Sequence, residues 1–575
     1  MIHSFIELKK ALKKDTASLP KTKVALVGDS ATQMLCTAIR GTAITKGYNF
    51  DIFEADYNQV EYQFMESSSD LFKFDADYII VFQSTHKLLS TYNKLKTDQL
   101  ASLADNRLSF VRHIASSSSV PIIYFNYPEI DDNVFGNYAN KTQNSFTYQV
   151  RKLNYELMKL SQEIANLYIC DIAAIQNKMG RDNMFHPSIY ASTDMVISVD
   201  ALPYVAKEAT DIIMAMKGSF KKCLILDLDN TLWGGVIGDD GLERIQIGHG
   251  LGIGKVYKEI QEWALKLKNR GIILAVCSKN NEEVAKEPFI NHPEMVLRLD
   301  DIAVFVANWE NKADNIRKIQ SILNIGFDSM VFLDDNPFER NLVRENLPEV
   351  TVPELPDDAA QYLEYLYSLN LFETASYSDA DADRTLQYQV EAKRAVAQFS
   401  FTNEGDFLKS LNMTSEVRGF NNFNTPRVSQ LSQRSNQFNL RTVRYTDSEI
   451  EQLSNSKAHH NLSFTLTDKY GDNGLICVII LEKQNNDTLF IGTWLMSCRV
   501  LRRGMENFTL NTIINYAKQN GFSTIIGEYI PTVKNQMVQN HYIELGFDDI
   551  SSNGQYLYQL DVDNYKPKET FITEI

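Results

Sequence analysis

Two acidic residues that follow a short apolar run are the clearest candidates for chemistry in this chain. Asp227 and Asp229 come after Cys223–Leu226, an unbroken apolar stretch of the kind that forms a fully buried parallel strand. Parallel sheets place reactive side chains at the carboxyl ends of their strands, so both carboxylates are expected in one crevice. Such carboxylates repel each other unless a cation lies between them, and oxygen ligands without nearby His or Cys favour Mg²⁺. The pattern predicts a magnesium site, although a buried strand that ends in an acidic turn would show the same few letters.

Three further segments follow in the order that phosphoryl chemistry needs. Residues 272–280 form a second apolar strand that ends in Ser278, and residues 330–339 form a third that ends in Asp334 and Asp335. Between them, Lys312 stands at the start of a helical pattern over residues 313–323. A nucleophile, a phosphate-binding hydroxyl, a cation and a second acid pair are together far more specific than any one of them.

The segments DLDNTLWGGVIGDDG, HPEMVLRLDDI, NWENKADNI and LDDNPFER resemble the haloacid dehalogenase (HAD) superfamily of aspartate-based phosphohydrolases, and most closely its FkbH-like branch. The resemblance implies that Asp227 attacks phosphorus and becomes an aspartyl phosphate. It implies that Asp229 protonates the leaving oxygen and later deprotonates water, so that the phospho-enzyme is hydrolysed. Ser278 and Lys312 would hold the phosphoryl oxygens.

The same resemblance implies the ligands of the cation and of the substrate. Mg²⁺ would be held by Asp227, by the backbone carbonyl of Asp229, by Asp334, and by Asp335 either directly or through water. The substrate is expected to be a small phosphorylated compound bound by Asn230, Thr231, Ser278, Lys279 and Lys312.

Length and composition exclude several classes of protein. A chain of 575 residues is too long for one hydrophobic core and suggests three or four domains. Its net charge of −16 argues against nonspecific binding to nucleic acid or to an anionic membrane. Its six cysteines are scattered and contain no CxxC pair, and no segment has the apolar length of a signal peptide or a membrane span. These features predict a cytoplasmic protein.

We expect an α/β protein of three domains. Residues 1–218 alternate strand-like and helix-like segments, as a doubly wound, flavodoxin-like α/β domain does. Residues 219–371 form the central parallel sheet, Rossmann-like and of the HAD type without a cap, and 372–399 form a linker helix. Residues 400–575 form an α+β domain whose segments 463–483 and 487–501 read as antiparallel strands.

The N-terminal domain resembles the SGNH esterases at the turn Gly28-Asp29-Ser30, where that family keeps its nucleophilic serine. His186 stands near the position of the family's base. The usual Asp-x-x-His is Asn183-x-x-His186, with Asp182 next to it, and the third block of the family has no match. A triad without its orienting acid and oxyanion donors is weak, so we expect a vestigial, non-catalytic SGNH-like domain.

The C-terminal domain resembles the GNAT acyltransferases in its order of strands and helices. That family binds the pyrophosphate of acyl-CoA at a loop between a strand and a helix, where backbone N–H groups face the anion. The corresponding residues are Arg499, Arg502, Arg503 and Gly504. An arginine replaces the first glycine of the family's pattern, which would hinder close approach of a pyrophosphate, whereas Arg502 and Arg503 could pair with phosphate instead. Segment 433–441 (QRSNQFNLR) is typical of FkbH-like proteins, but the residues alone suggest no role for it.

The intervals between the chemical segments are short. Only about fifty residues separate Asp227 from Ser278, and about thirty separate Ser278 from Lys312, which leaves no room for a cap domain. We therefore expect the site to be open, with the segment after Leu371 or the N-terminal domain narrowing its mouth.

The favoured interpretation is a Mg²⁺-dependent phosphatase, or a related glyceryl transferase that releases phosphate while passing a glyceryl group to the phosphopantetheine of an acyl carrier protein. The alternatives are a GNAT-like acyltransferase that uses acyl-CoA, and a multidomain scaffold in which the core is accessory.

Overall fold

The computed structural model describes residues 2–248, 250, 252–377, 386–391, 394, 403–497, 500–532, 534–552 and 554–575. The chain divides into two units, Met1–Ala215 and Met216–Ile575. No helix among the described residues combines the length and the apolar character that a membrane span needs.

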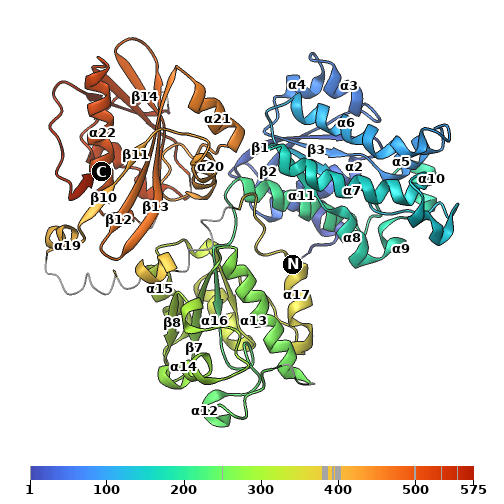
Figure 1. Ribbon diagram of the computed structural model, residues 1–575, viewed down its shortest axis with the longest axis horizontal. Coiled ribbons are helices and arrows are strands. Elements are labelled where there is room, and N and C mark those ends of the chain that lie inside the picture. Colours follow the sequence, from blue (N-terminus) through green and yellow to red (C-terminus); the bar gives the residue numbers. More distant parts are fainter. Residues whose placement is uncertain are drawn as a thin grey trace. The chain divides into compact units, whose positions relative to one another are not determined.

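The first unit is built on a parallel sheet (Figure 1), as the alternating pattern predicts. Its strands follow the order β2-β1-β3-β4-β5, and every neighbouring pair is parallel. The strands are β1 (Lys21–Gly28), β2 (Asn49–Glu54), β3 (Tyr78–Phe82), β4 (Ile122–Phe125) and β5 (Leu167–Cys170). The helices include α1 (Phe5–Ala11), α2 (Gln33–Thr45), α3 (Val60–Met65), α4 (Asp70–Phe74), α5 (Thr85–Tyr92), α6 (Leu103–Ser116), α7 (Phe146–Glu163), α8 (Ile172–Met179), α9 (Arg181–Met184), α10 (Pro187–Thr193) and α11 (Leu202–Met216).

The second unit begins with a parallel sheet in the order β8-β7-β6-β9, which we call the core sheet. Its strands are β6 (Cys223–Leu226), β7 (Ile273–Ser278), β8 (Val304–Ala307) and β9 (Met330–Leu333). The chain adds β7 and β8 on one side of β6 and then returns to add β9 on the other. The carboxyl ends of β6 and β9 therefore form the switch point at which open α/β sheets bind ligands. The helices of this part are α12 (Ile237–Asp240), α13 (Ile253–Asn269), α14 (Glu282–Asn291), α15 (Lys312–Leu323), α16 (Pro337–Asn346) and α17 (Tyr362–Leu369).

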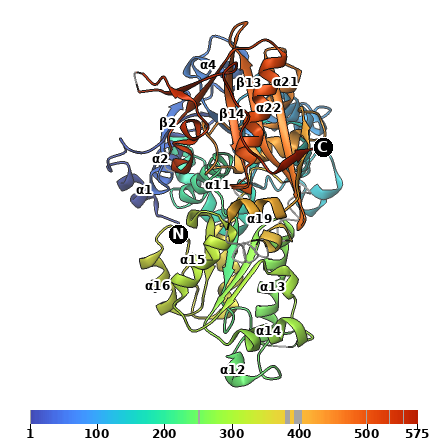
Figure 2. The same cartoon turned by 90° about the vertical axis from the view of Figure 1, so that its left-hand side faces the viewer.

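Strand β6 is apolar at every position because helices cover both faces of the sheet. Its side chains alternate, so that Leu224 and Leu226 pack into one buried cluster and Cys223 and Ile225 into another. The first cluster includes residues of α13, and the second includes residues of α15 and α16. Figure 2 shows α15 and α16 on one side of the core strands and α13 on the other. This burial on both faces fixes the strand that carries Asp227.

The rest of the second unit contains a larger sheet in the order β16-β17-β15-β14-β13-β12-β10-β18, with β11 paired to β12. Its strands are β10 (Met413–Ser415), β11 (Val417–Arg418), β12 (His459–Asp468), β13 (Gly471–Lys483), β14 (Thr488–Met496), β15 (Thr524–Tyr529), β16 (Asp548–Asp549), β17 (Tyr556–Asp561) and β18 (Ile572–Glu574). The accompanying helices are α19 (Glu404–Ser410), α20 (Thr425–Arg434), α21 (Asp447–Asn455), α22 (Met505–Gln519) and α23 (His541–Glu544). The predicted antiparallel strands are confirmed as β12, β13 and β14.

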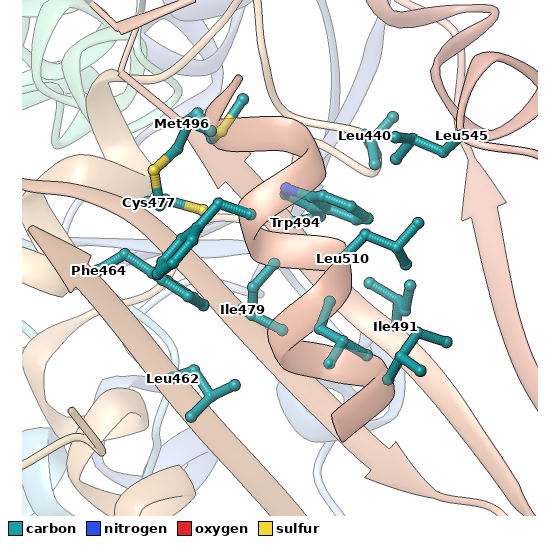
Figure 3. Packing of buried hydrophobic residues seen from close by; sticks show 14 of the residues in the cluster. Leu440, Leu462, Phe464, Cys477, Ile479, Ile491, Trp494, Met496, Leu510 and Leu545 are labelled. Atoms are coloured by element: carbon teal, nitrogen blue, oxygen red, sulfur yellow. The ribbon is translucent and has the colours of Figure 1, made fainter. Parts of the chain in front are cut away.

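Segment 433–441 contributes to this larger sheet. Strands β14 and β15 pair in parallel only over Thr488–Ile491 and Thr524–Gly527. Beyond that point Leu440 N donates to the carbonyl of Trp494 at 3.2 Å, and Ile530 N donates to the carbonyl of Leu440 at 2.9 Å. The segment thus fills the opening between the two strands with backbone hydrogen bonds. Leu440 and Trp494 belong to the buried cluster that Figure 3 shows against α22.

The beginning of the same segment is hydrogen-bonded to the residues just before β6, the first strand of the core sheet in the chain. Lys222, which precedes β6, donates from Nζ to the carbonyl of Arg434 at 2.9 Å, and Asn436 Nδ2 donates to the carbonyl of Gly218 at 2.8 Å. We call residues 433–436 the clasp. Residues 218–222 lead into the first residue of β6, so the clasp contacts the core sheet at the edge where its strands begin.

The segment after Leu371 lies at the same edge. Arg270, just before β7, donates to the carbonyl of Phe372, and the Arg434 guanidinium donates to the carbonyl of Ser376 at 2.9 Å. Gln389 donates to the carbonyl of Ile302, just before β8, at 3.0 Å. These described residues of the segment contact the edge of the sheet opposite the acids, so they do not narrow the mouth of the site, and for the rest of the segment the expectation stays a prediction. Most of the predicted linker helix, residues 372–399, lies outside the described residues, although 386–391 are helical.

The clasp leaves no room for a side chain at Gly218. Its φ is +75°, and a Cβ there would lie 2.6 Å from the carbonyl oxygen of Gln433 and 2.8 Å from a side-chain atom of Asn436. We expect Gly218→Ala to lower the free energy of unfolding by about 2–4 kcal/mol, through backbone strain and displacement of the clasp. Gly47→Ala is the matched control, since Gly47 has φ +81° but open space around its Cβ, so it carries the strain alone. If denaturant titrations show that both variants lose the same free energy of unfolding, displacement of the clasp does not destabilise the protein.

Candidate functional site

Three carboxylates meet at the carboxyl edge of the core sheet, as the acidic pairs predict. Asp227 follows β6, and Asp334 and Asp335 follow β9. One oxygen from each of the three lies within 4.8 Å of the others. The two strands are joined up to this point, since Asp227 N donates to the carbonyl of Leu333 at 2.9 Å. Hydrogen bonding between β6 and β9 therefore sets the spacing of the acids.

Lys312 supplies the positive charge in this group. It is the first residue of α15, whose N-cap Asn311 accepts a hydrogen bond from Asp314 N at 2.9 Å. Its Nζ lies 2.9 Å from Asp227 Oδ2 and 2.5 Å from Asp334 Oδ2. Burial alone would lower the pKa of Lys312, but the two carboxylates raise it above its usual range. The side chain is only 3% exposed and stays an ammonium ion.

One ammonium does not balance three carboxylates. Burial, and then the nearby charge of Asp227, raise the pKa of Asp334 to about 7 and that of Asp335 to about 6. Asp227 Oδ1 is buried and has no hydrogen-bond partner, a costly state for a carboxylate oxygen. Hard oxygen donors with an unpartnered atom among them fit a divalent cation such as Mg²⁺, which would lower both pKa values.

Asp229 is held apart from the other acids. Its Oδ1 accepts hydrogen bonds from Trp233 Nε1 and Ile237 N, both at 2.9 Å, and its Oδ2 accepts one from Asn280 Nδ2 at 3.1 Å. Burial raises its pKa, against the lowering effect of these donors. Its side chain is not part of the three-acid group. The prediction that its backbone carbonyl binds the cation stays a prediction.

The other predicted site residues line the same edge, and several of them fix loops. Ser278 is the last residue of β7 and is 1% exposed. Thr231 Oγ1 accepts a hydrogen bond from Asp335 N at 3.2 Å, which ties the two acidic loops together. Asn230 has φ +53°, and its Oδ1 accepts a hydrogen bond from Gly235 N at 2.9 Å. These contacts shape the loops around the acids.

Residues of α16 support the site in a way that sequence reasoning missed. Arg340 donates to the carbonyls of Asp334 and Asp335 at 2.9 and 2.6 Å, and Glu339 Oε1 lies 2.6 Å from Lys279 Nζ. Both residues of α16 are less than a tenth exposed. The motif LDDNPFER contains them, but a charged Glu-Arg pair in a helix usually faces solvent. Asn280 was missed for a similar reason, since polar residues after a strand are common.

Ser30 and His186, the candidate SGNH-like residues of the first unit, are not hydrogen-bonded to each other. Ser30 is 2% exposed, and its Oγ makes no hydrogen bond, whereas His186 is exposed. Asn183 Nδ2 donates to the carbonyl of Met179 at 2.7 Å. A hydrolytic Ser–His pair needs a hydrogen bond between its members. The structure therefore lacks the Ser30–His186 contact of an assembled triad.

The C-terminal loop differs from the expected anion site. Arg503 is 4% exposed, and its guanidinium pairs with Asp468 at 3.3 Å and with Glu391. Arg502 has φ +63°, and Gly504 has φ +77° where it caps α22. Arg499 lies outside the described residues. In this arrangement the chain's own carboxylates engage Arg503, one of the two arginines that could have paired with a phosphate.

Comparisons with known proteins agree with parts of this description. The family model of the FkbH N-terminal domain matches residues 23–214. Among solved structures, the N-terminal part of the protein BF1531 from Bacteroides fragilis, described as containing a phosphatase domain complexed with Mg, is 63% identical. The match covers 65% of this chain and all of that chain, with a TM-score of 0.64.

Acetyltransferase structures match a smaller share of the chain. The ribosomal-protein-S18-alanine N-acetyltransferase from Escherichia coli is 14% identical over 27% of this chain and 99% of its own, with a TM-score of 0.21. An N-acetyltransferase from Staphylococcus aureus Mu50 is 18% identical over 26% of this chain and 99% of its own, also with a TM-score of 0.21. None of the curated proteins compared with the chain matches it. The chain belongs to the same family as the Bacteroides fragilis protein BF1531, and it carries an FkbH N-terminal domain.

Proposed function

We propose that residues 219–371 form a Mg²⁺-dependent phosphohydrolase of the HAD type that works through an aspartyl phosphate on Asp227. The observation that carries this proposal is the group of three carboxylates within 4.8 Å of one another, in which Asp227 Oδ1 is buried without a partner. The related structure from Bacteroides fragilis supports it, since it is described as a phosphatase domain complexed with Mg.

The residues of the site have distinct tasks in this reaction. A carboxylate oxygen of Asp227 attacks phosphorus, and the bond from phosphorus to the leaving oxygen breaks. Lys312 contacts Asp227 and offsets the negative charge of the entering phosphoryl group. Bound Mg²⁺ would supply further positive charge to the phosphoryl oxygens, held by Asp227, Asp334 and Asp335.

Asp229 is suited to carry the proton. Burial raises its pKa, so the protonated form that a general acid needs is more populated than for an exposed carboxyl. In the first step it gives its proton to the leaving oxygen. In the second step it takes a proton from the water that attacks the aspartyl phosphate, which returns Asp227 and releases inorganic phosphate.

The resemblance to FkbH-like proteins adds a finer proposal about the substrate. It suggests a phosphoglyceryl or another small phosphorylated group that loses phosphate during transfer to a carrier protein. An assay of phosphate release from phosphoglycerates, phosphosugars and nucleotides, with and without acyl carrier protein, tests both the phosphohydrolase activity and the proposed substrate. If no phosphate ester is hydrolysed with Mg²⁺ present, the phosphohydrolase proposal fails.

Removal of the cation is expected to silence the enzyme. Without it, Asp227, Asp334 and Asp335 bring more negative charge to the site than the Lys312 ammonium offsets, so a phosphate dianion is repelled. Treatment with EDTA should lower phosphate release by at least about a hundredfold, and added Mg²⁺ should restore it. Asp334→Ala should weaken Mg²⁺ binding measured by calorimetry. Full activity in EDTA after dialysis would contradict the role of the metal.

A further inference from the structure

Two large aromatic side chains are exposed beside the candidate site, one on a loop and one at the start of a helix. Trp309 is 76% exposed and Phe338 is 68% exposed, whereas most other aromatic residues of the core are buried or partly buried. Trp309 follows β8, and Phe338 is the second residue of α16, after β9. Both therefore lie on the edge of the sheet that carries the acids.

The two residues are within reach of a bound substrate. Trp309 comes three residues before Lys312, and Phe338 comes three residues after Asp335. Three residues span at most about 11 Å between Cα atoms, roughly the length of a small organic phosphate. The clasp and the described part of the segment after Leu371 contact the opposite edge of the sheet. Those parts of the second unit leave the mouth open.

The backbone at both positions is held in place. Asn308 exchanges side-chain hydrogen bonds with Asn315 at 3.1 and 2.8 Å, and its Oδ1 accepts another from Glu310 N at 2.9 Å. Phe338 N donates to Asn336 Oδ1 at 2.9 Å. A single exposed aromatic residue needs no explanation. Two that lie beside one reactive site, with the backbone held by hydrogen bonds at each, indicate recognition of a ligand, because an aromatic ring is stabilised most by contact with another apolar surface.

The charges and the aromatic rings divide the site into two parts. The acids and Lys312 would hold the phosphoryl group together with a bound cation, and Asp227, Asp334 and Lys312 are far more buried than the two rings. Resting on the proposed phosphohydrolase function, we propose that Trp309 and Phe338 form an aromatic rim that binds the rest of the substrate. The substrate is then a phosphorylated compound whose non-phosphate part has an apolar face, such as an acyl chain or a ring, in addition to any hydroxyl groups.

Two probes separate this inference from the proposed function. p-Nitrophenyl phosphate carries an aromatic leaving group, and acetyl phosphate carries almost no apolar surface. We expect Trp309→Ala and Phe338→Ala each to lower the ratio of kcat/KM for p-nitrophenyl phosphate to that for acetyl phosphate by about tenfold, chiefly through KM. Trp309→Phe should recover most of the ratio. Phe423→Ala is the matched control, since Phe423 is 91% exposed and lies before α20.

Each outcome decides one question. If the wild-type protein hydrolyses neither probe, the phosphohydrolase proposal fails. If it hydrolyses both, and the ratio changes less than twofold in both alanine variants, the aromatic rim is wrong. If size-exclusion chromatography shows a wild-type dimer that Trp309→Ala and Phe338→Ala convert to a monomer without changing the ratio, the two rings bind a second copy of the chain, and the inference is again overturned.

Discussion

Replacement of Asp227 by asparagine is expected to lower phosphate release by at least about a thousandfold. Asparagine keeps the size of the side chain but cannot act as the nucleophile that forms an acyl phosphate. The fold should persist, because β6 is held by apolar packing on both faces and Asp227 N still pairs with the carbonyl of Leu333. Phosphate release and circular dichroism measured on the same preparation check both statements.

Asp29→Asn is the matched control for this change. Asp29 also follows the first strand of a parallel sheet and is 5% exposed, close to the 6% of Asp227. Its carboxylate accepts hydrogen bonds from Ser84 N, which the amide oxygen of asparagine can also accept. We expect this variant to keep wild-type phosphate release. A folded Asp227→Asn protein that retains more than a few per cent of activity would remove Asp227 from the role of nucleophile.

Lys312→Met is expected to impair both stability and catalysis. It removes the ammonium that contacts Asp227 and Asp334 and leaves their charges without a partner in a buried place. Loss of one partner of a buried ion pair costs about 3–5 kcal/mol, and bound Mg²⁺ should offset part of that cost. Thermal unfolding with and without Mg²⁺ measures the loss, and the rate of phosphate release should fall at least about a hundredfold. Lys255→Met, which removes an exposed pair with Glu259, should cost less than about 1 kcal/mol.

The loss in Lys312→Met should also depend on pH. The folded-state pKa values of Asp334 and Asp335, about 7 and about 6, already lie above the unfolded values, and loss of the ammonium raises them further. A raised pKa contributes stability at low pH that is lost as pH rises through the folded-state value. In the absence of Mg²⁺ the variant should therefore be closest to wild type near pH 5 and furthest from it near pH 8. A constant difference over this interval would mean that the acids are not the source of the instability.

The sequence predicted the reactive part of the core well because its signals are local. Four apolar letters before Asp227 define β6 at Cys223–Leu226, and Lys312 opens a helix as its pattern indicates. Parallel pairing then brings the ends of β6 and β9 together without further information. What local patterns could not supply was the contact from Asn280, which reaches Asp229 from the loop after β7.

The features that were missed or misplaced depend on contacts between distant segments. Residues 433–441 show no helical or strand-like hydrophobic period, because one part of the segment pairs with β14 and another is hydrogen-bonded to residues 218–222. The position of the segment after Leu371 depends on hydrogen bonds from Arg270 and Arg434, which lie far away in the sequence. Arg503 was assigned to an anion loop from its neighbours in the chain, whereas its partners Asp468 and Glu391 come from elsewhere.

The hydrogen bonds of Arg340 have a thermodynamic consequence for cation binding. This guanidinium already holds the carbonyls of Asp334 and Asp335, and Thr231 holds the amide of Asp335. Little of the chain is left to be ordered when the ion arrives, so the conformational entropy that often weakens binding is largely lost at folding. Calorimetry of Mg²⁺ binding should accordingly show a heat-capacity change close to zero. A loop that folded around its ion would instead bury apolar surface and give a clearly negative one.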